Sequence, residues 1–141
     1  MTNVLKHTTV SNDLANQLMD AATSRAHELG DRFSIAIVDV SGVLKNFRRL
    51  DACPLVGVDV AQDKAYTAVL KGIPTHEWYE GIKDNPSHLY GVPAAISRVT
   101  IFGGGYPIIV DGELVGGMGA SGGSYLEDMD VVKSALDAVI G

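Results

Sequence analysis

The chain has 141 residues, of which 46% are hydrophobic, and its formal net charge at pH 7 is −6. This length is typical of a single globular domain, so we expect one domain over residues 1–141. The negative charge argues against nucleic acid or an anionic membrane as a partner.

The N-terminal residues and the cysteine content both bear on where the protein works. Residues 1–10 contain no apolar run of the length, about 7 to 15 residues, that a signal peptide requires. The one cysteine, Cys53, cannot form an internal disulfide and is interpreted as a packed thiol. These features predict a cytoplasmic protein that does not enter the membrane.

A helix and a central strand are predicted at the start of the chain. Ser11 is a suitable N-cap for a helix over 12–29, in which apolar residues recur at helical spacing, and Gly30 suits its C-terminal end. Residues 33–40 are apolar on both faces, which is typical of a strand that is covered on both sides.

A less buried strand and a second helix come next in the chain. Residues 43–50 carry several polar side chains, so this strand is expected near an edge of the sheet. Residues 57–71 have the spacing of a helix, with Lys64 at the border of its apolar face.

Residues 72–95 are predicted to be mostly loop. Thr75 could cap a short helix that runs through Ile82, but glycines and prolines interrupt residues 81–93. A long irregular stretch in a small domain is more often functional, or packed on a partner, than idle.

Three strands and a helix are predicted in the second half. Residues 98–102 read as a strand, and Asp111-Gly112 predicts a type I′ hairpin in which Ile109 faces Leu114 and Ile108 faces Val115. A capping box at Ser124 and Glu127 predicts a final helix that begins at Ser124. The expected sheet therefore has five strands.

A glycine pattern in this half resembles a nucleotide site. Residues 117–122 spell G-x-G-x-x-G, but a dinucleotide fingerprint also needs a following strand and an acidic residue about 20 positions on. The sequence up to Gly141 ends with a helix and offers no such strand, and no Gly-Lys-Ser or Gly-Lys-Thr follows a glycine run. The glycines are interpreted instead as a pocket rim or a tight hairpin.

Three motifs occur in order: Asp59 to Ala68 with Lys-Ala-Tyr-Thr-Ala, Ile101 to Pro107, and Gly116 to Asp128 with Ser-Gly-Gly. Together they resemble the GlcG/HbpS family, which is often labelled haem-degrading and includes the C-terminal domain of PduO-type cobalamin adenosyltransferases. The resemblance covers about 33–140. It implies an α/β (α+β) fold, profilin-like, with a five-stranded antiparallel sheet, helices on both faces, and assembly into homo-oligomers.

Haem or another tetrapyrrole is the ligand that this resemblance implies. His76 and His88 are the candidate iron ligands, with Trp78, Tyr79 and Tyr90 beside the macrocycle. The alternative is that these are ordinary surface histidines and loop aromatics. The aspartates of the first half have no spacing that defines a further metal site.

Lys64 is the candidate catalytic residue. At the border of an apolar face its pKa could be lowered enough for Schiff-base chemistry or anion binding. The alternative is that its stem packs on the helix and its ammonium reaches water.

An anion site is predicted at the start of the final helix. Free amides at Gly122, Gly123 and Ser124, with Ser121 beside them, would meet a second backbone segment at Gly103, Gly104 and Gly105, and Lys64 would close the pocket. A carboxylate or propionate is expected there, and Gly122→Val is expected to abolish binding without affecting assembly. The alternative is that Glu127, Asp128 and Asp130 already satisfy the helix dipole.

Two functions remain open from the sequence. One is a homo-oligomeric binding protein for haem or a related tetrapyrrole. The other is a small-molecule enzyme, a lyase, isomerase or hydratase acting on a carboxylated substrate, so whether the protein is an enzyme is left undecided. The oligomer interface is expected to bury much of 72–95, with Trp78 as its anchor.

Overall fold

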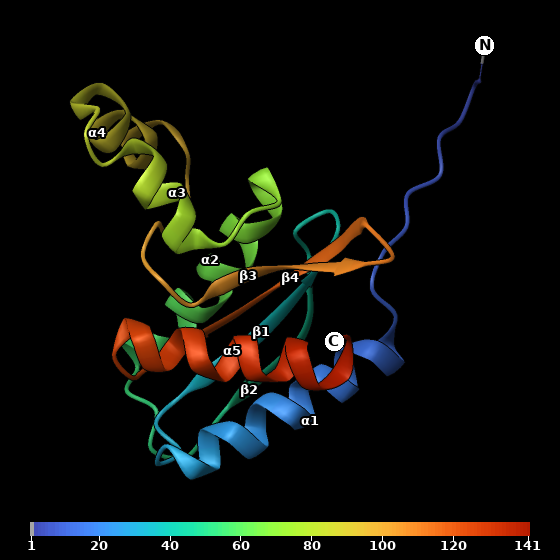
Figure 1. The fold of residues 1–141 in the computed structure, drawn as a ribbon, viewed down its shortest axis with the longest axis vertical. Helices are drawn as coiled ribbons and strands as arrows, with labels where there is room; N and C mark the ends of the chain where they lie inside the picture. The colour runs from blue at the N-terminus through green and yellow to red at the C-terminus, as the bar shows by residue number, and fades with distance from the viewer. Residues whose placement is uncertain (1) are drawn as a thin grey trace.

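The computed structural model describes residues 2–141, which form an α+β fold (Figure 1). None of the helices in this range is both long and apolar enough to cross a bilayer. The elements in chain order are α1 (Asn12–Glu28), β1 (Ser34–Asp39), β2 (Leu44–Arg49), α2 (Val56–Lys71), α3 (Thr75–Ile82), α4 (Pro86–Ala95), β3 (Gly105–Val110), β4 (Glu113–Ser121) and α5 (Tyr125–Val139).

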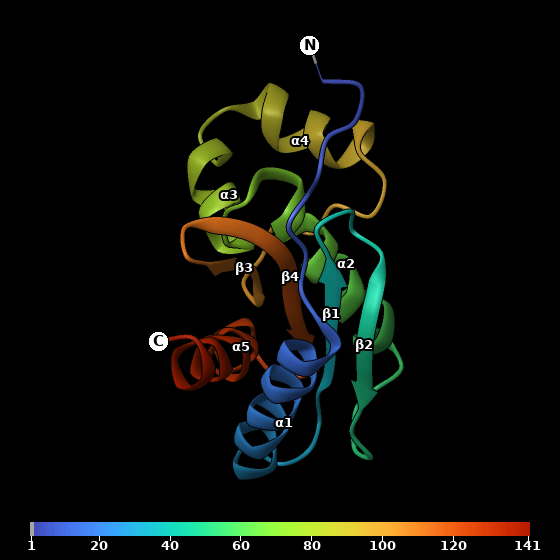
Figure 2. The same cartoon turned by 90° about the vertical axis from the view of Figure 1, so that its right-hand side faces the viewer.

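The strands form one antiparallel sheet in the order β2-β1-β4-β3. Helices α1 and α5 lie together on one face and α2 lies on the other, while α3 and α4 lie at the end of the molecule away from α1 (Figures 1 and 2). The polar strand predicted near an edge is the edge strand β2, as expected.

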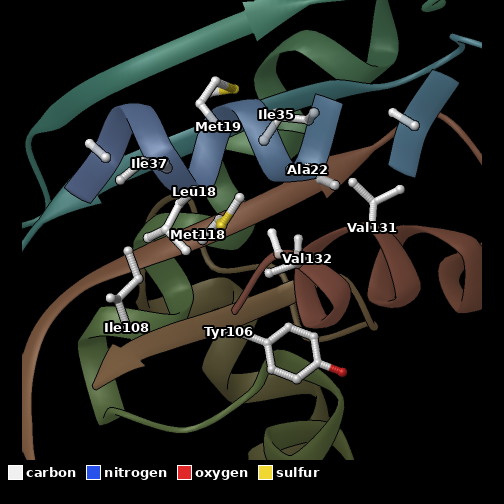
Figure 3. Packing of buried hydrophobic residues seen from close by; sticks show 14 of the residues in the cluster. Leu18, Met19, Ala22, Ile35, Ile37, Tyr106, Ile108, Met118, Val131 and Val132 are labelled. Atoms are coloured by element: carbon white, nitrogen blue, oxygen red, sulfur yellow. The ribbon is translucent and has the colours of Figure 1, made fainter. Parts of the chain in front are cut away.

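Strand β1 is the centre of the fold because both of its faces are buried. Ile35 and Ile37 pack with α1 and α5, whereas Ala36 and Val38 pack with α2. This alternation is the period of two that a strand imposes on its side chains. Figure 3 shows the larger of the two clusters, in which Leu18 from α1 and Val132 from α5 meet the sheet.

Both predicted helix starts are confirmed by their caps. The Ser11 hydroxyl accepts a hydrogen bond from the amide of Leu14, and a complete capping box joins Ser124 and Glu127 at the start of α5. Each cap satisfies an amide that the first turn of a helix leaves without a partner.

The sheet has four strands, so the prediction of five is wrong. Residues 98–102 are irregular, and Arg98 adopts a φ of 66° that a strand does not allow. Two threonine side chains take the place of a neighbouring strand as hydrogen-bond partners for this segment: Thr67 binds the amide of Thr100, and Thr75 binds the carbonyl of Phe102.

The prediction that residues 72–95 are mostly loop is also wrong, because they form α3 and α4. The prolines that argued for loop are accommodated: Pro86 is at the start of α4, where its missing N–H costs nothing, although Pro93 lies within the helix. Asn85, not foreseen as a cap, accepts from the amide of His88.

The hairpin register is correct at its tip and shifted beyond it. Asp111 and Gly112 have φ values of 51° and 80°, as a type I′ turn requires. Ile109 pairs with Leu114 as predicted, but Ile108 pairs with Gly116, since an irregularity in the ladder adds one residue to β4.

The glycines of β4 are explained by helix packing. A Cβ on Gly117 would lie 2.2 Å from the carbonyl oxygen of Ala65, and one on Gly119 would lie 2.3 Å from that of Ala61. Two of the three glycines in the G-x-G-x-x-G pattern therefore let the backbone of α2 approach the sheet closely.

Candidate functional site

A cleft of about 300 Å³ opens between α3, the irregular segment before β3 and the start of α5. Its lining is mainly aromatic and apolar, which is typical of sites for small organic ligands. The lining residues are His76, Tyr79, Glu80, Ile101, Phe102, Gly103 and Tyr125.

Helix α3 supplies the first wall because it is amphipathic. Trp78 and Ile82 are buried, which turns Tyr79 and Glu80 outward. The ammonium of Lys71 lies 5.2 Å from the centre of the Trp78 ring. Since Trp78 is only 5% exposed in the single chain, the prediction that it anchors an oligomer interface is wrong.

Among the polar groups of the cleft, His76 has the most unusual surroundings. Its ring lies 5.7 Å from the ring of Tyr106, tilted by 58°, and its Nδ1 is buried without a hydrogen-bond partner. In residues 2–141 no other buried side-chain nitrogen or oxygen lacks a partner. Such exceptions are rare in folded proteins and often mark functional groups.

The second wall consists of Phe102 and Gly103, with Tyr125 from α5 beside them. A Cβ on Gly103 would lie 2.5 Å from Sδ of Met129 and 3.2 Å from Cδ2 of Tyr125. Glycine thus lets the segment lie directly on α5. Phe102 and Tyr125 remain 52% and 55% exposed, so the cleft is open to solvent.

Lys64 lies behind this wall and is sealed from solvent. Its Nζ donates to Oδ2 of Asp128 at 2.8 Å and to the carbonyl of Ala120 at 3.0 Å, and it lies 4.7 Å from the centre of the Phe102 ring. Lys64 is 0% exposed and Asp128 is 2% exposed. The interpretation in which the lysine ammonium reaches water is therefore wrong.

Burial shifts the pKa values of this pair in opposite directions. It lowers the pKa of the Lys64 ammonium, against the influence of the Asp128 carboxylate. It raises the pKa of the Asp128 carboxyl, against the influence of Lys64 and of the hydrogen bond from the amide of Gly123. Both shifts reflect the cost of taking two charges out of water.

Residues 10–137 match a protein family described as haem degrading protein HbpS-like. The chain belongs to the HbpS-like family. The family predicted from the three motifs is thus confirmed, and the α+β class is confirmed with a four-stranded sheet.

Individual HbpS-like relatives differ in length. The corrinoid adenosyltransferase PduO of Citrobacter freundii is 38% identical over 125 residues, which are 88% of this chain but only 37% of PduO. The chain therefore spans little more than a third of that relative. A crystal structure of a PduOC:haem complex is 36% identical, with a TM-score of 0.86 over 94% of this chain and 96% of that one. A double mutant of HbpS from Streptomyces reticuli is 27% identical, with a TM-score of 0.87 over 100% of this chain and 93% of that one.

The anion site predicted for this HbpS-like chain is already filled by the protein itself. The amide of Gly123 donates to Oδ1 of Asp128 at 3.0 Å, and the amide of Ser124 donates to Oε1 of Glu127 at 3.0 Å. The expected approach of Lys64 to the helix start is correct, but the anion it meets is Asp128.

Gly122 cannot test ligand binding in the way that the sequence suggested. It has a φ of 132°, and a Cβ there would lie 1.9 Å from the carbonyl oxygen of Arg32. Gly122→Val would therefore disrupt the fold at the start of β1, so its expected effect on binding alone is wrong.

The remaining predicted site residues either pack in the interior or are exposed to solvent. Gly104 and Gly105 face the interior, where a Cβ would meet Nζ or the carbonyl oxygen of Lys64 at 2.8 and 2.4 Å. Ser121 is 8% exposed at the end of β4, and neither it nor Gly123 lines the cleft. His88 is exposed on α4, outside the cleft.

The structure thus brings His76, Tyr79 and Gly103 together out of the predicted set. It adds Tyr125 to the cleft, and it gives Thr75 and Asp128, which the sequence named only as residues of helix starts, contacts to Phe102 and Lys64 behind the wall. The sequence did contain a signal for Tyr125. It follows the capping Ser124 and therefore lies in the first turn of α5, next to the predicted glycine pocket. Nothing in the local sequence indicated that Asp128 would pair with Lys64, 64 residues earlier.

Proposed function

We propose that this protein is a homo-oligomeric binding protein for haem or a related tetrapyrrole, which it holds at the cleft between α3 and α5. The main support is the likeness to the PduOC:haem complex, at 36% identity over 94% of the chain. Family membership adds to this, because the family is described as haem degrading.

The residues of the cleft fit a tetrapyrrole. Tyr79, Phe102 and Tyr125 offer aromatic surface for a planar macrocycle, and His76 offers an imidazole, a common axial ligand of haem iron. The buried Nδ1 of the same ring has no hydrogen-bond partner, and such orphaned groups often mark functional residues. When bound, haem would supply an iron centre for ligand binding or electron transfer.

The enzyme alternative rests on Lys64, and the structure does not favour it. A Schiff-base lysine needs access to a substrate carbonyl, whereas Lys64 is 0% exposed and engaged with Asp128 and Ala120. Lys64 is better explained as a structural residue that holds α2, β4 and α5 together.

An oligomer is supported by apolar surface that a single chain leaves uncovered. None of residues 86–95 is buried, and Tyr90 in this helix is 76% exposed. The cleft is also open beside Phe102 and Tyr125. A second copy covering α4 would remove this surface from water. We expect light scattering at micromolar concentration to show an oligomer, and a monomer would remove this part of the proposal.

The test of the ligand is a haem titration that compares two histidines. Wild type should give a saturable shift of the Soret band, and His76→Ala should lose it. His88→Ala is the matched control: the same substitution on the neighbouring helix, at an exposed histidine outside the cleft. Loss of binding in both variants, or in neither, would remove the assignment of His76. Absence of a shift in wild type would remove the proposed function.

A further inference from the structure

The two walls of the cleft come from parts of the chain that are ordered in different ways. Helix α3 holds its own shape through its backbone hydrogen bonds. The wall at 101–103 is irregular and belongs to no strand ladder, so its position depends on individual side-chain contacts. The contact that fixes the irregular wall relative to α3 therefore decides the width of the cleft.

Thr75 makes that connection. It is the first residue of α3 and is completely buried. Its Oγ1 donates to the carbonyl of Phe102 at 2.7 Å and accepts from the amide of Gly105 at 3.1 Å. In the part of the chain that the structure describes, every hydrogen bond between α3 and residues 101–105 involves this hydroxyl.

Thr75 and Gly105 are also closely packed. A Cβ on Gly105 would lie 2.6 Å from Cγ2 of Thr75. The methyl group thus packs against the glycine while the hydroxyl bridges its amide and the Phe102 carbonyl. His76 is the next residue of the helix after Thr75, so the threonine holds one residue of each wall in place.

We propose that Thr75 is a positioning residue of the ligand site, which holds His76 and Phe102 at the separation that the bound ligand requires. This inference rests on the proposed function. Without the hydroxyl, the amide of Gly105 and the carbonyl of Phe102 lose their partner, and the irregular wall moves to find water or a new one.

Thr67 provides a matched control within the same segment. Its Oγ1 donates to the carbonyl of Asp63 at 2.6 Å and accepts from the amide of Thr100 at 2.9 Å. It is as buried as Thr75 and anchors the same irregular segment, and neither threonine lines the cleft itself. Thr67 binds the segment at Thr100, however, and not at residues 101–105. A purely structural role would make the two threonines equivalent.

The experiment compares haem titrations of wild type with Thr75→Val, Thr75→Ser and Thr67→Val. Thr75→Val should raise the Kd for haem about tenfold, because the hydroxyl that holds the irregular wall against α3 is lost. It should also change the position of the Soret band. Thr75→Ser, which keeps the hydroxyl, should stay within about threefold of wild type. Thr67→Val should lose a comparable amount of stability in urea unfolding and keep the wild-type Soret band.

Wild-type affinity and spectrum in Thr75→Val, or equal weakening in Thr67→Val, would overturn the proposal. A wild-type protein without a Soret shift would overturn the proposed function itself and the role of Thr75 with it. A second measurement needs no variant: haem should slow amide hydrogen exchange more at Gly105 than at Thr100, because a ligand that contacts both walls stabilises the bond that joins them. Equal protection at the two amides would count against Thr75.

Discussion

The polar groups on the two sides of the Phe102 ring differ in whether they are paired. On the inner side, Lys64 and Asp128 satisfy one another and are sealed. On the cleft side, His76 has a buried nitrogen without a partner beside surface that is open to solvent. The inner side has the character of a structural site and the cleft side that of a binding site, although the sequence suggested catalysis on the inner side.

Pairing explains why the two sides differ. A buried charge is tolerated only when it is paired and hydrogen-bonded, and Asp128 achieves this with Lys64 and the amide of Gly123. An unpaired buried group persists only if something else requires it. The lesson is that a lysine beside glycines is weak evidence for a ligand until its partner is known.

The largest expected effect comes from breaking the sealed pair. Lys64→Met leaves the Asp128 carboxylate buried without its counter-charge, and should lower the free energy of unfolding by about 3 to 5 kcal/mol. The double variant Lys64→Met, Asp128→Asn removes both charges, retains an acceptor for Gly123, and should recover most of the loss. Urea unfolding at pH 7 measures both.

Lys45→Met is the control for that experiment, because Lys45 is exposed on β2. It should change stability by less than about 0.5 kcal/mol. If Lys64→Met were as mild as Lys45→Met, the pair would not be a structural requirement, and a functional role for the lysine would return.

Elements whose signals are local were predictable from the sequence. Ser11, Ser124 with Glu127, and Asp111-Gly112 each act on their own turn, and each is where it was expected. The two-sided burial of β1 was equally predictable from an uninterrupted apolar run.

Elements that depend on distant partners were not predictable. Residues 98–102 have strand-like composition, but Thr67 and Thr75 supply the hydrogen bonds that a neighbouring strand would have supplied. The site was predicted in part for the same reason. His76 and Gly103, which the sequence assigned to two different sites, both line the cleft. The pairing of Lys64 with Asp128 could not be predicted, because it depends on α2 and α5 lying against opposite faces of β4.

The second-largest effect is expected on the cleft side, where the substitution should raise the free energy of unfolding and not lower it. His76→Phe keeps a ring beside Tyr106 and removes the nitrogen that has no partner. Without haem it should raise the free energy of unfolding by about 1 to 2 kcal/mol, because an unsatisfied buried polar atom is removed. Haem should then stabilise wild type in thermal unfolding but not the variant.

His88→Phe is the matched control, since His88 is exposed on α4. It should leave both stability and the response to haem close to wild type. A His76→Phe protein less stable than wild type would mean that Nδ1 carries no cost, and the contrast between the two sides of Phe102 would lose its basis.

The smallest effect comes from a surface ion pair whose carboxylate, Asp130, lies on the same helix as Asp128. Asp130 accepts from Nε and Nη2 of Arg25 at 3.2 and 2.6 Å, which joins α5 to α1, and this hydrogen bonding lowers the pKa of the Asp130 carboxyl. Because the folded-state pKa lies below the unfolded value of about 3.9, the stabilisation is present above about pH 4 and is lost as the pH falls through the lowered pKa. The pKa of Asp128 is shifted upward by burial, so its contribution changes with pH in the opposite direction.

Asp130→Asn should therefore lower the free energy of unfolding at pH 7 by about 0.5 to 1 kcal/mol, since both partners are about a third exposed and water screens them. The difference from wild type should shrink as the pH is lowered from 5 towards 2, and also in high salt, when urea unfolding is measured across that range. Asp20→Asn, at a more exposed carboxylate that meets Arg48 at 3.3 Å, should show almost no change. A difference for Asp130→Asn that persists unchanged in acid would show that the hydrogen bonds, and not the charge, hold α5 to α1, and Asp128 and Asp130 would then differ in burial alone.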